Sequence, residues 1–244
     1  MCYYATLGDE SFNMENIAVN REKTEVEKEN KKSFAQGLNF YKLVWIFAVS
    51  CVVGFAVETL WCLIKLGHIE SRKSLVYGPI SIVYGMGAVI LTLALYKIKD
   101  AKWYKIFLVS FVVGTVTEYI ASLGEEIVFG VRAWDYSNVP LNINGRVCLL
   151  YSLFWGVLGL FWIKVCYPFM SKVIEKVPFT LGKVLTWAFI VFFIFDCALS
   201  ASAAFRMDAR AEGVAPKNSF EQYLDSEFPD DRIHKIYANS EKVE

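Results

Sequence analysis

Long apolar runs alternate with short polar segments along the chain. Five runs of roughly 20 mainly apolar residues occupy positions 44–66, 76–96, 104–126, 148–169 and 184–205. A helix rises about 1.5 Å per residue, so each run is long enough to cross about 30 Å of hydrocarbon. The runs also lack the polar stripe of a helix in a soluble protein. The pattern predicts an all-α membrane bundle of about five transmembrane helices.

Charge is concentrated outside these runs. Residues 1–42 hold 13 and residues 206–244 hold 15 of the 50 charged residues. We therefore divide the chain into a polar N-terminal tail (1–38), a transmembrane bundle (39–205) and a C-terminal tail (206–244). Apolar residues recur among the charges of the C-terminal tail, which predicts short amphipathic helices that dock on another surface.

The flanking Lys and Arg residues predict an orientation. Fourteen of them flank the runs in the N-terminal segment and in the second and fourth loops, against five in the first and third loops. Because basic residues favour the cytoplasmic side, the N-terminus is predicted to be cytoplasmic. The first and third loops then face the exterior.

An internal repeat links the first four runs. Val52, Val53, Gly54 and Glu58 recur 60 residues later as Val112, Val113, Gly114 and Glu118, and Arg72, Tyr77 and Gly85 recur 74 residues later as Arg146, Tyr151 and Gly159. Each unit is a two-helix hairpin, one over about 44–96 and one over about 104–169. An even number of spans per unit predicts two parallel repeats, followed by a fifth helix at about 184–205.

The repeated residues carry the candidate chemistry. A carboxylate within a membrane span costs several kcal/mol and normally faces protein or a wet cavity. Two glutamates, two arginines and two tyrosines could converge beneath one outward-facing vestibule: Glu58, Glu118, Arg72, Arg146, Tyr77 and Tyr151. The alternative is structural, with Glu58–Arg72 and Glu118–Arg146 as ion pairs that brace each hairpin.

Further candidates come from the fifth run and the third loop. Asp196 is a third carboxylate within a span and needs a polar partner in the bundle. The third loop is rich in turn-forming residues, so we expect it to cap the vestibule. Arg132, Trp134 and Asp135 would extend the lining from this loop.

Several activities are not supported by this sequence. It has no GxxxxGK[ST] loop, so ATP hydrolysis would need a separate ATPase subunit. Its six cysteines form no CxxC and its two histidines are far apart, so no metal or cofactor is predicted. A net charge of zero argues against nucleic acid as a partner.

Four segments carry a resemblance to a known family: YGPISIVYGMG, FGVRAWDYS, NINGRVCLLYSLFWG and FEQYLDSEFPDDR. From about residue 44 to about residue 237 the chain resembles the ABC-transporter type IV, permease-like family of bacterial inner-membrane proteins. The resemblance implies a multi-pass protein of the bacterial inner membrane with a role in transport. It implies no catalytic residues.

Three functions remain open from the sequence. The first is a permease-like component with an outward-facing polar vestibule for an anionic or amphiphilic ligand, whose partners are membrane lipid, an ATPase subunit and a second copy of the chain. The second is a membrane enzyme acting on a lipid-linked substrate at the outer leaflet, with Glu58 or Glu118 as general base. The third is a structural or regulatory membrane subunit.

Overall fold

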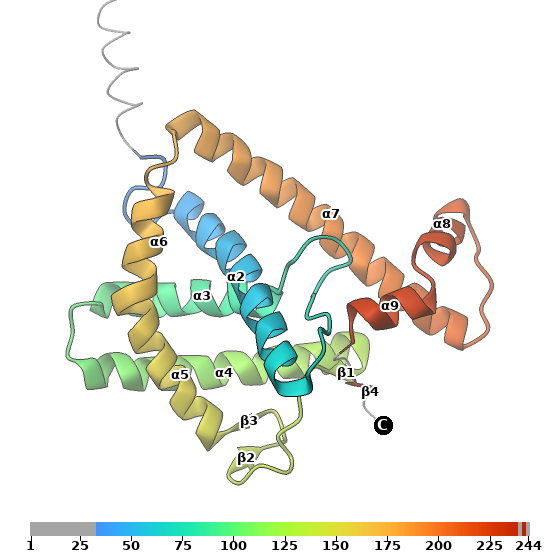
Figure 1. Ribbon diagram of the computed structural model, residues 1–244, viewed down its shortest axis with the longest axis horizontal. Coiled ribbons are helices and arrows are strands. Elements are labelled where there is room, and N and C mark those ends of the chain that lie inside the picture. The colour runs from blue at the N-terminus through green and yellow to red at the C-terminus, as the bar shows by residue number, and fades with distance from the viewer. Residues whose placement is uncertain (1–32, 239–240, 243–244) are drawn as a thin grey trace, which may run out of the picture.

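Long apolar helices dominate the computed structural model, which describes residues 33–238 and 241–242 (Figure 1). Residues 1–32 of the predicted N-terminal tail lie outside this part. Within it, four helices are long and apolar enough to span a membrane: α2 (Phe40–Leu66), α4 (Trp103–Phe129), the continuous helix Leu149–Ile174, and α7 (Phe179–Ala211). Most of their apolar side chains are exposed on the outside of the protein. The chain is therefore an all-α membrane bundle, as predicted.

The second predicted span is shorter than the sequence pattern suggested. It consists of α3 (Ile82–Leu95) and the 3₁₀ turn η1 (Tyr96–Ile98), so helix begins at Ile82 instead of residue 76. Gly78 has a φ of +70°, in the left-handed region, and Pro79 has no amide hydrogen to donate. These two residues keep the preceding apolar segment out of the helix. The helical part of this span is about 25 Å long at 1.5 Å per residue.

The remaining elements are the three parts of the continuous helix and several short helices and strands. The continuous helix consists of α5 (Leu149–Phe161), a π-helical turn η2 (Trp162–Cys166) and α6 (Tyr167–Ile174). The loop between α4 and α5 contains β1 (Val131–Arg132) and a hairpin of β2 (Asn142–Ile143) with β3 (Val147–Cys148). After α7 come α8 (Ser219–Glu227), α9 (Asp230–Ile236) and β4 (Glu241–Lys242), which pairs antiparallel with β1.

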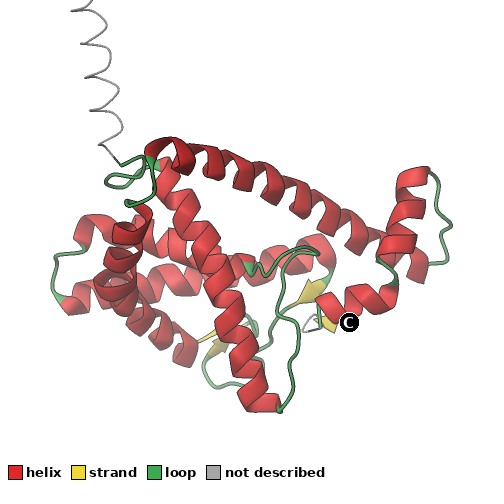
Figure 2. Cartoon of the chain, turned by 45° about the horizontal axis from the view of Figure 1, so that its top comes forward, coloured by secondary structure: helices red, strands yellow, loops and turns green. Residues whose placement is uncertain are grey.

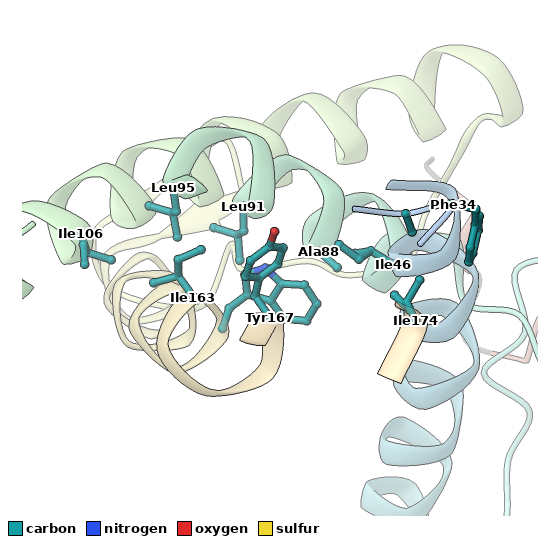
Figure 3. Close-up of a cluster of buried hydrophobic side chains, with 11 residues drawn as sticks. Phe34, Ile46, Ala88, Leu91, Leu95, Ile106, Ile163, Tyr167 and Ile174 are labelled. Carbon is teal, nitrogen blue, oxygen red and sulfur yellow. The ribbon is translucent and has the colours of Figure 1, made fainter. Parts of the chain in front are cut away.

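The largest buried hydrophobic cluster lies at the end where α2 and α7 begin. Here α7 contacts α2 through the Trp45 indole, which donates a 2.9 Å hydrogen bond to Thr186, and from there the two helices diverge (Figures 1 and 2). Figure 3 shows the buried cluster at this end, formed by α2, α3, α4 and α5–α6; its members include Ile46, Ala88, Leu91, Leu95, Ile106, Ile163 and Tyr167. The opposite end carries the two loops 67–81 and 130–148.

Equivalent contacts in the two hairpins define the repeat. A Cβ on Gly54 would overlap the side chain of Tyr84, and a Cβ on Gly114 would overlap that of Trp155. Likewise Phe47 packs on Gly85, and Phe107, which is 60 residues later, packs on Gly156. The first helices are therefore related by 60 residues, as predicted, whereas these contacts relate the second helices by 71 residues.

The predicted offset of 74 residues is wrong for the second helices. Gly85 corresponds to Gly156, and not to Gly159, because each packs against the equivalent phenylalanine. By the same register Tyr77 and Tyr151 are not equivalent positions. The offset of 74 does hold for one pair in the loops, since Arg72 and Arg146 make matching contacts that are described below. The two loops differ in length on either side of this pair, which hid the true register.

The C-terminal helices dock on the bundle, as the amphipathic pattern predicted. Their apolar side chains form a buried cluster with Val76, Leu199 and Ala203; the tail contributes Leu224, Phe228, Ile233 and Ile236. The tail therefore packs on both the loop 67–81 and the last turns of α7. Pairing of β4 with β1 brings it to the second loop as well.

An ion-pair network fixes α8 against α7 and predicts acid sensitivity. Arg206 donates two hydrogen bonds of 2.8 Å to the carboxylate of Asp225, and Arg210 donates one of 2.6 Å. The hydrogen bonds from Arg206 hold the pKa of Asp225 below its usual range. A depressed pKa stabilises the docked state above the unfolded pKa of about 3.9, and this contribution is lost as the pH falls through the folded value.

Hydrogen exchange checks this acid sensitivity. At neutral pH residues 219–236 should be more protected in the wild type than in Asp225→Asn. That difference should begin to shrink as the pH falls below about 4 and should vanish only below the depressed pKa of folded Asp225. A difference that persists undiminished at pH 3 would contradict the role given to Asp225.

Candidate functional site

The first hairpin places an acidic and a basic residue on one helical face. Glu58 and Cys62 are four residues apart on α2, so they lie on the same face. Arg72, from the following loop, donates a 2.8 Å hydrogen bond to the sulfur of Cys62 and pairs with Glu70 at 2.8 Å. The half-buried Glu58 carboxylate interacts electrostatically with this guanidinium. The loop thus returns an arginine to the face that carries the glutamate.

The second hairpin repeats this arrangement. Glu118 and Ser122 are four residues apart on α4, at the positions that correspond to Glu58 and Cys62. Arg146, from the loop after α4, donates a 3.3 Å hydrogen bond to Ser122 and stacks over the ring of Tyr119. In both hairpins an arginine therefore contacts the residue four positions after the glutamate.

The arginines form ion pairs with other carboxylates than the structural alternative predicted. Arg146 pairs with Glu126 at 2.8 Å, and Arg132 pairs with the same carboxylate. Arg72 pairs with Glu70. Neither predicted pair, Glu58–Arg72 or Glu118–Arg146, is an ion pair in the described part of the chain, because a nearer carboxylate takes each guanidinium.

Neutral donors hold Glu118 instead. The hydroxyl of Tyr136 donates a 2.9 Å hydrogen bond to Oε1, and the indole of Trp155 donates a 2.9 Å hydrogen bond to Oε2. Burial, and then the nearby Glu118 carboxylate, raises the pKa of Tyr136, so its hydroxyl keeps its proton and remains a donor. Tyr136 in turn stacks on Tyr151, with ring centroids 4.5 Å apart.

The loop 130–148 is ordered by its own polar side chains. The Trp134 indole donates a 2.9 Å hydrogen bond to the carbonyl of Arg146. Asp135 accepts hydrogen bonds from the backbone and hydroxyl of Ser137, and Gly145, with a φ of +67°, packs directly against these two residues. Trp134 and Asp135 thus fix the loop that delivers Arg146 and Tyr136.

Two predicted site residues lie elsewhere. Asp196 is fully buried in α7, where its Oδ1 accepts a 3.2 Å hydrogen bond from the backbone amide of Tyr77. Ser200, one turn later, accepts a hydrogen bond from the amide of Val76. The ring of Tyr77 packs edge-on against Phe228 of the tail. Both residues therefore belong to the junction of the loop 67–81, α7 and the tail.

Sequence reasoning missed several partners of the candidate residues. Glu126 was obscured because it ends an apolar run, and Trp155 and Tyr84 each precede a glycine that marks a close helix contact. That shared aromatic–glycine pair was the available signal. Within the described residues no group of three or more His, Cys, Asp or Glu side chains could hold a metal ion.

Comparison with known proteins agrees with this architecture. The model of the family described as "Putative ABC-transporter type IV" matches residues 45–201, which run from α2 into α7 and include both hairpins. No curated protein and no solved structure matches the chain. Since the match covers more than half of the sequence and agrees with a multi-pass helical bundle, the chain belongs to the Putative ABC-transporter type IV family.

Proposed function

We propose that the chain is the membrane-spanning permease component of a transporter that receives an amphiphilic ligand with an anionic headgroup. The headgroup binds at the end of the bundle that carries the loops 67–81 and 130–148. The repeated face, with a glutamate and an arginine-contacted residue four positions later, is the observation that carries this proposal. Two copies of one polar arrangement in otherwise apolar hairpins are costly to keep in a membrane without a role.

The arginines are the receptors for the anion. A guanidinium binds phosphate or carboxylate through two parallel hydrogen bonds, which a lysine cannot reproduce. Arg132 and Arg146 share the carboxylate of Glu126, so an arriving anion can take one guanidinium while the other stays neutralised. Glu118 does not contact the bound anion, because Tyr136 and Trp155 already occupy its carboxylate. Asp196 holds the loop 67–81 in place through Tyr77.

The two ends of the bundle have different partners in this proposal. The excess of Lys and Arg supports a cytoplasmic N-terminus, and in this proposal the ligand end faces the exterior of a bacterial inner membrane. A separate ATPase subunit would bind the lysine-rich end, where Lys164 donates a 2.6 Å hydrogen bond to the carbonyl of Lys99 and joins two segments. A second copy of the chain would complete the transport path, because five spans are few for one.

A binding experiment tests the arginines. Arg72→Gln and Arg146→Gln should each weaken binding of dioleoyl phosphatidylglycerol to the detergent-solubilised protein by about tenfold, since each removes a charge-assisted hydrogen-bond donor pair. Native mass spectrometry with added lipid measures the bound fraction. Lys235→Gln is the matched control, since it removes a positive charge from the exposed surface of α9. Equal binding by all four proteins would refute an arginine receptor.

Lipid turnover and protein abundance, measured with the same protein and its variants, distinguish this proposal from the two other functions. An enzyme that acts on a lipid-linked substrate would turn over lipid extract without any ATPase, and this proposal expects no such turnover. A purely structural subunit would lose abundance in parallel with any functional loss in the arginine variants. We expect Arg72→Gln to remain at normal abundance, because Arg72 bonds only to Glu70 and Cys62 among the described residues.

A further inference from the structure

The two equivalent glutamates have different surroundings. Glu58 and Glu118 occupy the same position of α2 and α4, and beside each stands the equivalent aromatic residue, Tyr84 or Trp155. In the second hairpin both carboxylate oxygens of Glu118 accept hydrogen bonds from neutral donors. Its hydrogen-bonding capacity is largely filled from within the protein.

The donor that closes the second site is fixed in place. The backbone amide of Tyr136 donates a 2.7 Å hydrogen bond to the carbonyl of Gly145, and its ring stacks on Tyr151. The Tyr136 hydroxyl therefore cannot leave Glu118 without opening the loop that Trp134 and Asp135 hold together. The Glu118 carboxylate is therefore closed to a ligand by the loop of its own hairpin.

The first hairpin has no equivalent closure in the described part of the chain. Glu58 accepts no hydrogen bond there, and Arg72 acts on it only through its charge. The shorter loop 67–81 brings an arginine to this face but no counterpart of Tyr136. A half-buried carboxylate with free acceptor oxygens, beside a guanidinium, is complementary to a headgroup that has both a positive and a negative end.

We propose that the first hairpin alone binds a zwitterionic amphiphile, one with an ammonium and a phosphate group. The ammonium donates hydrogen bonds to Glu58 and the phosphate binds Arg72, an assignment that rests on the proposed function. Val57, Trp61 and Ile64 form an exposed apolar stripe on α2 next to Glu58, where the acyl chains lie. Glu118 has become a structural acceptor.

Paired lipids test this division of roles. The detergent-solubilised protein is titrated with dioleoyl phosphatidylethanolamine, which has both charges, or with dioleoyl phosphatidylglycerol, which has only the phosphate. Native mass spectrometry gives the ratio of the two bound fractions. Glu58→Gln should lower this ratio about tenfold and leave phosphatidylglycerol binding unchanged. Glu118→Gln, the matched control at the equivalent position, should leave the ratio unchanged and lower the midpoint of thermal unfolding.

The possible outcomes distinguish a failure of the Glu58 assignment from a failure of the proposed function. Retained phosphatidylglycerol binding shows that the Glu58→Gln variant is folded. Loss of both lipids in this variant would overturn the assignment of Glu58 to the ammonium, because that assignment requires the loss to be confined to phosphatidylethanolamine. An unchanged ratio would overturn it as well, and so would a ratio that falls equally in Glu118→Gln. If wild-type protein bound neither lipid, the proposed function itself would fail.

Discussion

Phe228→Ala is expected to release the C-terminal helices from the bundle. The Phe228 side chain is 0% exposed and packs against Tyr77 and Tyr223, with ring centroids 6.1 and 6.5 Å away. Removing a buried phenylalanine costs about 3–5 kcal/mol, partly through the cavity that it leaves. Leu224, Ile233 and Ile236 belong to the same cluster, so the cavity weakens their packing as well. Amides in residues 219–236 should therefore exchange rapidly in hydrogen-exchange measurements.

The loop 67–81 should respond to the same substitution. Val76 is buried against the tail, and Tyr77 contacts Phe228 directly, so amides near these residues should also lose protection. Phe220→Ala is the matched control, because Phe220 lies on α8 but is 51% exposed. Unchanged protection of the tail in Phe228→Ala would show that the polar network of Arg206 and Asp225 holds it alone.

Gly114→Leu should separate the helices of the second hairpin. The backbone of α4 lies so close to Trp155 that even a Cβ at Gly114 would overlap the indole near its attachment to α5. Small residues at such crossings let membrane helices approach closely. Overpacking a well-packed contact costs about 1–3 kcal/mol, and a leucine here exceeds the space by more than one methyl group. The midpoint of thermal unfolding in detergent should fall.

Gly124→Leu is the control for that prediction. Gly124 lies on the same helix, but a Cβ there would meet no atom within 4 Å. Glycine is roughly 0.8–1 kcal/mol less favourable than alanine in a helix interior and leucine ranks just after alanine, so this variant should be neutral or slightly more stable. The indole of Trp155 also donates to Glu118, so Gly114→Leu should disturb the polar face as well. Equal stability of the two variants would contradict the close crossing.

The sequence could predict the membrane class because hydropathy depends only on local composition. The ends of the helices were less accessible, since they depend on single residues. Gly78 and Pro79 delay α3, while Asn39 caps α2 by accepting a 2.9 Å hydrogen bond from the amide of Lys42. Lys42, which counted as a flanking basic residue, is instead buried, and it ties α2 to α6 by donating hydrogen bonds to Ser171 and Glu175.

The candidate site was partly predictable for a similar reason. Charged residues within apolar runs are conspicuous, so Glu58, Glu118 and Asp196 could be found from the sequence alone. Their partners could not, because they depend on loop conformation. Tyr136 reaches Glu118 across 18 residues of chain, and only the folded loop brings the two side chains together. The register of the repeat was hidden for the same reason, since the loops differ in length.

Photo-crosslinking can locate the headgroup site itself, with a phosphatidylethanolamine that carries a photoactivatable group next to its headgroup. Mass spectrometry of the crosslinked peptides locates the headgroup on the chain. We predict labelling concentrated in residues 54–81, well above that of the lysine-rich end at 95–105, and its loss in Arg72→Gln. Labelling spread evenly over both ends, or unchanged in Arg72→Gln, would contradict a headgroup site on the first hairpin.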